Sequence, residues 1–220
     1  MILSLLQNDI QLGVILIVTL VFSLSFHEFA HAYAAYKLGD NTAAYQGRLT
    51  LNPLAHLDPI GSLMLLFIGF GYAKPVPVNP VNLKNPRVDM MKVAFAGPLS
   101  NLFLCLLSCL VIRLMDSNIF VMYPNYSVQL SSVGLVLYMF AIINMTLAIF
   151  NLIPIHPLDG GQIFGGYLDK VNPQFSYKLR ADGPKILFAI IIIGYVTGFS
   201  VIGLIISPFH ELVTLIAGLK

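Results

Sequence analysis

Two histidines and a glutamate within five residues are the part of this sequence best suited to chemistry. His27, Glu28 and His31 form the motif HEFAH. On an α-helix, positions four apart lie one turn apart on the same face, so both imidazoles can bind one zinc ion. Zinc lowers the pKa of water to about 7, and the Glu28 carboxylate can take the water proton and pass it to a leaving amine. The motif therefore predicts hydrolysis assisted by zinc.

The alternative interpretation is a pair of packing histidines beside a chance glutamate. The surrounding sequence argues against it, because residues 10–26 contain no charged side chain and are typical of a membrane span. An ionisable residue inside such a span is costly and is usually functional. The setting of the motif thus favours the metal site.

Composition places the whole chain in a membrane. Of its 220 residues, 57% are hydrophobic and only 10% are charged, whereas a soluble domain has about 25% charged residues. The net charge of +2 is too small to indicate a nucleic-acid partner. A helix needs about 20 apolar residues to cross the hydrocarbon core. Four runs come close to that length: 10–33, 93–115, 131–153 and 186–207.

A fifth apolar run, 59–73, is short for a span and predicts a re-entrant or partly buried segment. We therefore expect an all-α polytopic membrane protein with about four transmembrane helices and this short segment. The chain is expected to form one domain, 1–220, with its core at 10–166 and a C-terminal helical segment at 184–220.

Basic residues indicate the orientation in the bilayer. If only the four long runs cross, ten of the twelve Lys and Arg residues fall in the loops 37–92 and 156–185. Loops rich in Lys and Arg remain in the cytoplasm. We therefore expect the N-terminus outside, both loops in the cytoplasm, and His27 and His31 toward the cytoplasmic end of the first span.

Catalytic zinc usually has three protein ligands and an open fourth position. Candidates for the third ligand on the cytoplasmic side are His56, Asp58, His156 and Asp159. The third span ends on that side, so Asp159 arrives in the same leaflet as the histidines. Pro154 and Pro157 end the helix just before it and let Asp159 turn inward on irregular backbone. Asp159 is the predicted third ligand, with one zinc ion per chain.

Four stretches stand in an informative order: FHEFAH, NPLAHLDPIG, AGPLSN and NLIPIHPLDGG. In this order and spacing they resemble the site-2 protease family of intramembrane zinc metalloproteases, in its compact bacterial and archaeal form without a PDZ or CBS domain. The resemblance covers most of the chain from the first span to about residue 166. It implies that His27, His31 and Asp159 bind zinc and that Glu28 is the catalytic base.

The resemblance further implies an endopeptidase that cleaves peptide bonds in or near transmembrane segments of other proteins. The expected partners are a transmembrane protein substrate and the lipid bilayer of a prokaryotic cell membrane. Asn151, eight residues before Asp159, would hold substrate or the developing oxyanion. Its alternatives are packing between helices or capping of backbone freed by Pro154. Asn144, on nearly the same face, is interpreted as a packing residue, with a contact to substrate or to the site as the alternative.

His56 and Asp58 lie in the first cytoplasmic loop. A permanent fourth ligand would close the zinc site, so His56 is expected to bind substrate, to steady Asp159, or to occupy the zinc in a resting state. His156 is expected to be a solvated loop residue, and its role stays open. The stretch AGPLSN looks structural, because small residues let helices approach and Asn101 can bond across.

The segment YAKPVPVNPVNL alternates valine with proline over residues 75–80. Proline confines a strand to a sheet edge or a bulge. A small extended or β element beside the zinc site could hold an unwound substrate by β-strand addition. The alternative is a rigid polyproline connector.

Two other functions stay open from the residues alone. A prenyl-protein protease uses HExxH with a distant glutamate ligand, but no glutamate lies between Glu28 and Glu211. The other is a non-enzymatic membrane metal-binding or metal-transport protein, which has no need of a glutamate beside a ligand histidine. Replacing Glu28 by Gln separates this second function from a protease, because only a protease would lose hydrolysis while keeping zinc.

Overall fold

A computed structural model describes residues 6–68, 71–115, 119–122 and 128–219. Helices dominate these residues: α2 (Ile10–Lys37), α3 (Thr42–Tyr45), α4 (Pro59–Ile68), α5 (Pro86–Met115), α6 (Ser132–Leu152), α7 (Asp159–Val171), α8 (Pro173–Thr197) and α9 (Val201–Ala217). Two short 3-10 turns lie at Pro53–Ala55 and Pro80–Asn82. Strands β1 (Phe120–Met122) and β2 (Val128–Leu130) pair antiparallel.

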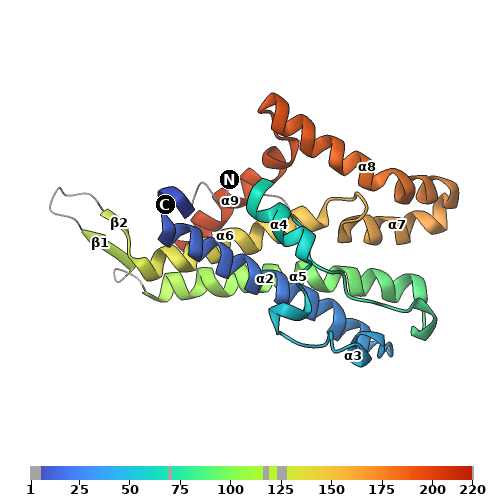
Figure 1. Ribbon diagram of the computed structural model, residues 1–220. Helices are drawn as coiled ribbons and strands as arrows, with labels where there is room; N and C mark the ends of the chain where they lie inside the picture. The colour runs from blue at the N-terminus through green and yellow to red at the C-terminus, as the bar shows by residue number, and fades with distance from the viewer. Residues whose placement is uncertain (1–5, 69–70, 116–118, 123–127, 220) are drawn as a thin grey trace.

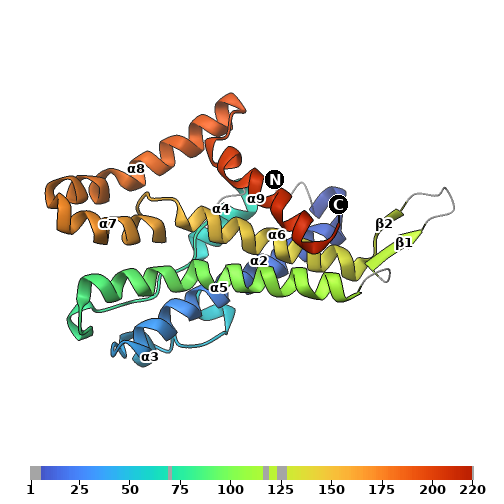
Figure 2. The same cartoon turned by 180° about the vertical axis from the view of Figure 1, so that it is seen from behind.

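Three long helices, α2, α5 and α6, form the body of the molecule (Figure 1). Each is apolar and long enough to cross a bilayer. At 1.5 Å per residue they are about 42, 45 and 32 Å long, against about 30 Å of hydrocarbon. In both views they lie side by side, with the β1–β2 hairpin at one end and α3 and α7 at the other (Figures 1 and 2). Three of the predicted apolar runs thus form helices long enough to span a membrane.

Local sequence signals set the ends of these helices. The side chain of Asp9 accepts from Leu12 N–H and caps α2, and Ser131 caps α6 in the same way. Helix α6 ends at Leu152 because the next residue, Ile153, precedes Pro154. A residue before proline is pushed toward extended backbone, and Ile153 has ψ of 129°. The chain is thereby released toward Asp159, as the sequence predicts.

One core cluster packs α5 and α6 against α9. It contains small and medium-sized side chains, among them Cys105, Cys109, Ala141, Met145 and Val213. Both cysteines are free and buried. Buried free cysteine behaves as a small apolar residue, so these two serve packing.

The fourth predicted span, 186–207, is wrong as a single straight helix. Helices α8 and α9 meet at 84° across a short break, so the described residues contain three spans, or up to four if the bent pair is one broken span. Gly198 ends α8 in the left-handed region, with φ of +72°, where glycine is the favoured residue. Ser200 then caps α9 by accepting from Gly203 N–H at 3.0 Å. Hydropathy alone did not predict the break, because the run stays apolar through it.

The short fifth run forms α4, whose ten residues cover about 15 Å, half of the hydrocarbon core. Asp58 caps it by accepting from the N–H groups of the two residues that follow Pro59. The chain then returns, because Ala73 forms a bridge with Leu57. This path fits the predicted re-entrant or partly buried segment; residues 69–70 of the run lie outside the described part.

The predicted β element beside the zinc site is not formed as a sheet. Residues 74–79 form no strand in the described part of the chain, and the isolated bridge at Ala73 comes just before them. Prolines 75, 77 and 80 lack the N–H groups that a ladder needs. The hairpin of β1 and β2 lies at the opposite end of the molecule (Figure 1).

Candidate metal centre

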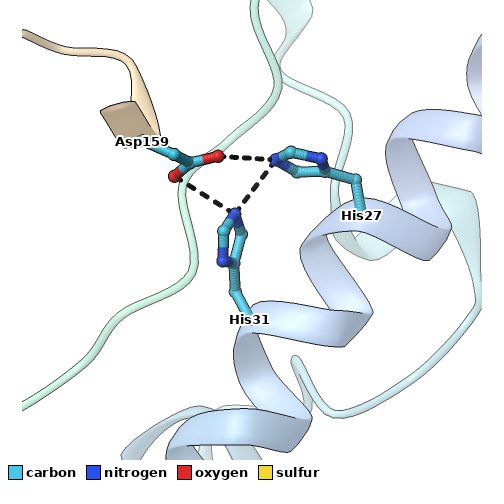
Figure 3. Close-up of side chains that lie close together, drawn as sticks. All are labelled: His27, His31 and Asp159. Atoms are coloured by element: carbon cyan, nitrogen blue, oxygen red, sulfur yellow. Dashed lines mark hydrogen bonds and ion pairs between the residues drawn. The ribbon is translucent and has the colours of Figure 1, made fainter. Parts of the chain in front are cut away.

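His27, His31 and Asp159 converge on one point between α2 and the start of α7 (Figure 3). His27 Nε2 lies 3.1 Å from Asp159 Oδ2, and His31 Nε2 lies 3.4 Å from Asp159 Oδ1. The two Nε2 atoms are 3.0 Å apart. Both histidines are buried. Asp159, which lies 128 positions beyond His31 in the sequence, thus brings a carboxylate to the two imidazoles.

These atoms have the spacing that a single zinc ion requires. Ligand atoms about 2.0–2.1 Å from a tetrahedral zinc lie about 3.3 Å from one another. Here the two Nε2 atoms are 3.0 Å apart, and each lies 3.1 or 3.4 Å from one of the two Asp159 oxygens. Asp159 Oδ2 is buried and has no hydrogen-bond partner. A buried carboxylate oxygen of this kind is suited to a cation. The residues therefore fit the metal.

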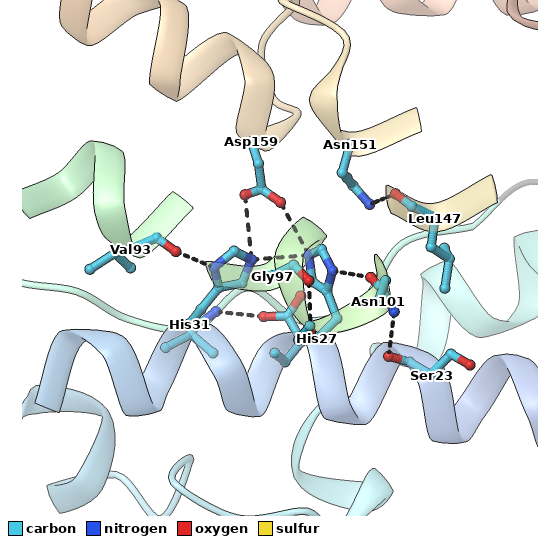
Figure 4. Close-up of polar contacts among 12 residues, drawn as sticks. Ser23, His27, His31, Val93, Gly97, Asn101, Leu147, Asn151 and Asp159 are labelled. Atoms are coloured by element: carbon cyan, nitrogen blue, oxygen red, sulfur yellow. Dashed lines mark hydrogen bonds and ion pairs between the residues drawn. The ribbon is translucent and has the colours of Figure 1, made fainter. Parts of the chain in front are cut away.

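The Nδ1 atom of each imidazole, on the far side of the ring from Asp159, also has a hydrogen-bond partner. His31 Nδ1 lies 2.8 Å from the main-chain oxygen of Val93, and His27 Nδ1 lies 2.5 Å from Asn101 Oδ1 (Figure 4). The Val93 carbonyl can only accept, so His31 Nδ1 carries the hydrogen and Nε2 keeps its lone pair. Both contacts come from α5.

Glycines make room for this arrangement. A Cβ at Gly97 would overlap His31 Nε2 and His27 Cε1, so α5 can lie against the imidazoles only with glycine there. A Cβ at Gly160 or Gly161 would overlap the main chain just after α6 and before Asp159. The glycines that follow Asp159 thus let the first turn of α7 pack on the end of α6.

Glu28 lies on the same helix as the histidines and is 9% exposed. Its Oε2 accepts from Val76 N–H at 3.2 Å. Val76 belongs to residues 74–79, which have no regular secondary structure and which we call the strap. The strap lies between α4 and α5 in the sequence, and its Val76 N–H donates to the carboxylate of the predicted catalytic base.

Arg48 anchors the strap, and sequence reasoning missed it. Its guanidinium is buried and donates to the carbonyl oxygens of Lys74 at 2.5 Å and Pro75 at 3.2 Å. A lone arginine in a loop gives no periodicity or spacing signal. Asp40 fixes the other end of the strap, because its carboxylate accepts from the main-chain N–H of Asn79 at 2.7 Å.

The two other predicted asparagines are placed differently. Asn151 lies at the end of α6 near Asp159, but its Nδ2 donates to Leu147 O in its own helix at 3.0 Å (Figure 4). Asn144 is fully buried and accepts from Asn101 Nδ2 at 2.8 Å. Asn144 therefore packs between helices and is also connected, through Asn101, to His27.

The structure does not bring His56 and Asp58 to the metal centre. His56 is buried, with Nε2 2.8 Å from Thr50 O and Nδ1 3.5 Å from the Arg48 guanidinium. Asp58 is engaged as the cap of α4. His56 thus supports the loop that carries Arg48, whereas Asp58 begins α4.

His156 is half-buried, in contrast to the expected solvated residue. Its Nε2 is buried without a hydrogen-bond partner. Burial and the nearby Arg180 charge lower the pKa of His156 below its usual value. A Cβ at Gly183 would overlap the His156 backbone and Cβ, so α8 packs closely over this histidine.

Comparison with known proteins gives related zinc metalloproteases. Residues 114–196 match the model of Peptidase family M50. "Putative zinc metalloprotease YwhC" of Bacillus subtilis is 43% identical over 167 residues, which are 74% of this chain and 72% of that relative. "Putative zinc metalloprotease Rip2" of Mycolicibacterium smegmatis is 30% identical over 180 residues, 80% of this chain and 64% of the relative.

A more distant relative covers more of this chain. "Zinc metalloprotease MJ0392" of Methanocaldococcus jannaschii is 27% identical over 208 residues, which are 94% of this chain and 50% of the relative. The chain thus spans about half of MJ0392 and less than two thirds of Rip2. No solved structure matches it.

Proposed function

Because the chain belongs to peptidase family M50, the site-2 protease family, it is a zinc metalloprotease, and we propose that it cleaves peptide bonds in or near transmembrane segments of other membrane proteins. The observation that carries the proposal is the meeting of His27, His31 and Asp159 beside Glu28 within a bundle of apolar helices. A soluble peptidase has no use for such a setting, whereas a substrate in the bilayer can reach it laterally.

In this proposal His27, His31 and Asp159 hold one zinc ion. Bound zinc supplies Lewis acidity, which polarises a scissile carbonyl and lowers the pKa of water to about 7. Two neutral imidazoles and one carboxylate leave a net positive charge at the site and an open fourth position. That donor set is the usual one for hydrolytic zinc.

Glu28 acts as the general base and then as the acid. Its carboxylate takes a proton from the attacking water and passes it to the leaving amine. The Val76 N–H occupies Oε2, so Oε1 is the oxygen that acts on the proton. Holding one oxygen fixes the plane of the carboxylate relative to His27 and His31.

Asn151 is proposed to hold substrate or to stabilise the developing oxyanion. Its amide now donates to Leu147 O, and a change in its side-chain torsion angles would free Nδ2 for substrate. Removing one such donor typically costs about 10²–10³ in rate. Its place at the end of α6, near Asp159, supports this role (Figure 4).

The substrate must be extended at the cleavage point, because a helix hides its amide bonds. We propose that it lies along the strap and pairs with main-chain groups of residues 76–78, because the N–H groups of Val76 and Asn79 already donate to Glu28 and Asp40. The strap's contact with Glu28 supports this. The centre faces the cytoplasmic side of a prokaryotic cell membrane in this proposal, and residues 1–220 act as one domain.

The test compares three purified, detergent-solubilised proteins: wild type, E28Q and D159A. We expect about one zinc per wild-type chain, wild-type zinc with no peptide cleavage in E28Q, and little zinc in D159A. Cleavage is measured on a fluorescent transmembrane peptide, and zinc by elemental analysis. Full zinc in D159A would mean that another residue is the third ligand, and full cleavage by E28Q would remove Glu28 from the mechanism.

A further inference from the structure

A buried side-chain amide contacts the His27 imidazole at Nδ1, the nitrogen that does not face Asp159. Asn101 of α5 is fully buried, and its Oδ1 lies 2.5 Å from His27 Nδ1 (Figure 4). Its Nδ2 points the other way and donates to Asn144 Oδ1 of α6 at 2.8 Å and to Ser23 O of α2 at 3.3 Å. Asn101 thus links the three long helices at the metal centre.

The direction of this amide is fixed by its neighbours. Asn144 Nδ2 donates to Phe140 O and to Ser23 Oγ, both at 2.9 Å, so the Asn144 oxygen faces Asn101. The Ser23 hydroxyl donates to Thr19 O at 2.7 Å and therefore accepts from Asn144. Because Ser23 O can only accept, an Asn101 amide turned by 180° would set its oxygen against two acceptors.

The fixed amide selects one tautomer of His27. An oxygen that faces Nδ1 requires the hydrogen there, and Nε2 then keeps its lone pair. His27 Nε2 is the atom that lies 3.1 Å from Asp159. His31 reaches the same state through the Val93 carbonyl, 2.8 Å from its Nδ1. The two imidazoles therefore direct their Nε2 lone pairs at one point. The tautomer of His31 is set by a main-chain carbonyl, and that of His27 is set by a side chain, which mutation can change.

We propose that Asn101 is a positioning residue for zinc binding: it selects the Nδ1-protonated tautomer and the ring orientation of His27, while Asn144 and Ser23 hold its amide in place. This rests on the proposed function, in which His27 is a ligand. Side chains that orient metal-binding histidines typically contribute 10–100-fold to metal affinity. Ser23, Asn101 and Asn144 are all fully buried, and each uses its hydrogen-bonding groups within this one network, as a polar group inside a membrane must.

The alternative is that the amide only joins helices. N101D and N101L separate the two roles. N101D keeps an oxygen for His27 Nδ1–H but places its other oxygen against the acceptors Asn144 Oδ1 and Ser23 O. N101L has a similar size and removes both functions. The dissociation constant of zinc is measured by competition with a chelator in detergent, together with the melting temperature of the zinc-free protein.

Zinc affinity and the zinc-free melting temperature should rank N101D and N101L in opposite order, with N101D binding zinc more tightly and N101L melting at the higher temperature. We expect N101L to weaken zinc binding about 10–100-fold and N101D to stay within a few-fold of the wild type. The zinc-free melting temperature should be lower for N101D, because a carboxylate is buried against acceptors. Wild-type zinc affinity in N101L, or the same order in both measurements, would overturn the proposal.

Ser108 provides a matched control on the same helix. It is buried and donates to Leu137 O of α6 at 2.8 Å, two turns beyond Asn101. S108A should lower the melting temperature and leave the zinc dissociation constant unchanged. If neither Asn101 variant folds, N144L tests the proposal instead. It keeps the Asn101 side chain but removes the Asn144 oxygen that fixes the direction of the Asn101 amide. Several-fold weaker zinc binding in N144L supports the proposal, and wild-type affinity overturns it.

The ligand assignment itself is tested separately by H27A. Loss of zinc in H27A with wild-type affinity in N101L would reject the role of Asn101 and leave the proposed function standing. Full zinc in H27A would reject His27 as a ligand, and with it both proposals. The two failures are therefore distinguishable.

Discussion

The main-chain N–H of Val76 donates to Glu28 Oε2 at 3.2 Å, across 48 residues of sequence. This contact ties the predicted catalytic base to a segment that comes from the loop between α4 and α5. The position of the Glu28 carboxylate is thus set by the strap as well as by the helix that carries Glu28.

Replacing Val76 by proline removes this donor. A hydrogen bond to a charged group contributes about 1.5–3 kcal/mol, so V76P should lower the rate of peptide cleavage about 10–100-fold while zinc content stays near that of the wild type. V76A keeps the N–H and should cleave at least about tenfold faster than V76P. Equal rates for V76P and V76A would show that the Val76 N–H does not contribute to cleavage.

Arg48 should be replaceable by lysine only at a cost in stability. A lysine offers a point charge and cannot span the carbonyls of both Lys74 and Pro75 as the guanidinium fork does. We expect R48K to lower the free energy of unfolding by about 1–3 kcal/mol, measured by thermal melting in detergent. The exposed Arg87 is the control, and R87K should melt within a degree or two of the wild type.

Replacing Gly97 by alanine should disturb the metal centre directly. The added Cβ would overlap both imidazoles, and α5 must move away or the rings must turn. A misplacement of about 1 Å can cost about 10²-fold in rate, so we expect G97A to lose most zinc and most cleavage. The Ser100 hydroxyl donates to the Gly97 carbonyl of its own helix, so S100A controls for changes in α5. Wild-type zinc content in G97A would contradict the close packing.

The Asp40 network predicts a dependence of stability on pH. The carboxylate accepts from the N–H and hydroxyl of Thr42, from Asn79 N–H and from the Asn82 amide, and these bonds lower the pKa of Asp40 below its usual value despite burial. A lowered pKa in the folded protein gives stability that is present above the unfolded value of about 3.9 and lost as the pH falls below it.

The difference in melting temperature between wild type and D40N should therefore be constant above about pH 5 and shrink toward pH 3. D182N provides the control, because Asp182 lies on the exposed part of α8 beside Lys185. A wild-type–D40N difference that grows as the pH falls would contradict the assignment.

The sequence predicted that His27, His31 and Asp159 come together because its signals are local or topological. Helical spacing puts His27 and His31 on one face, and the positions of the apolar runs bring Asp159 to the same end of the bundle. The three predicted spans in α2, α5 and α6 follow from the same apolar runs. These signals depend on length and periodicity, which a sequence displays directly.

The residues that support the centre could not be predicted in this way. Arg48 acts on carbonyl oxygens of the strap, and any residue type supplies such an oxygen. Asn101 was interpreted as a helix-packing residue, because nothing in AGPLSN shows that its oxygen meets His27. The 84° break before α9 depends on one left-handed glycine, Gly198, within an apolar run. Each of these depends on a tertiary contact or on a backbone angle.

Helix α7 is 13 residues long and runs from Asp159 to the turn into α8. It is therefore a rigid rod of about 20 Å with the carboxylate at its pivot end. A sideways shift of about 2 Å where α7 meets α8 rotates this rod by only about 6°, and the carboxylate, a few ångströms from the pivot, moves by about 0.3 Å. If α7 turns about its Asp159 end, a displacement of α8 therefore reaches the predicted zinc ligand strongly reduced.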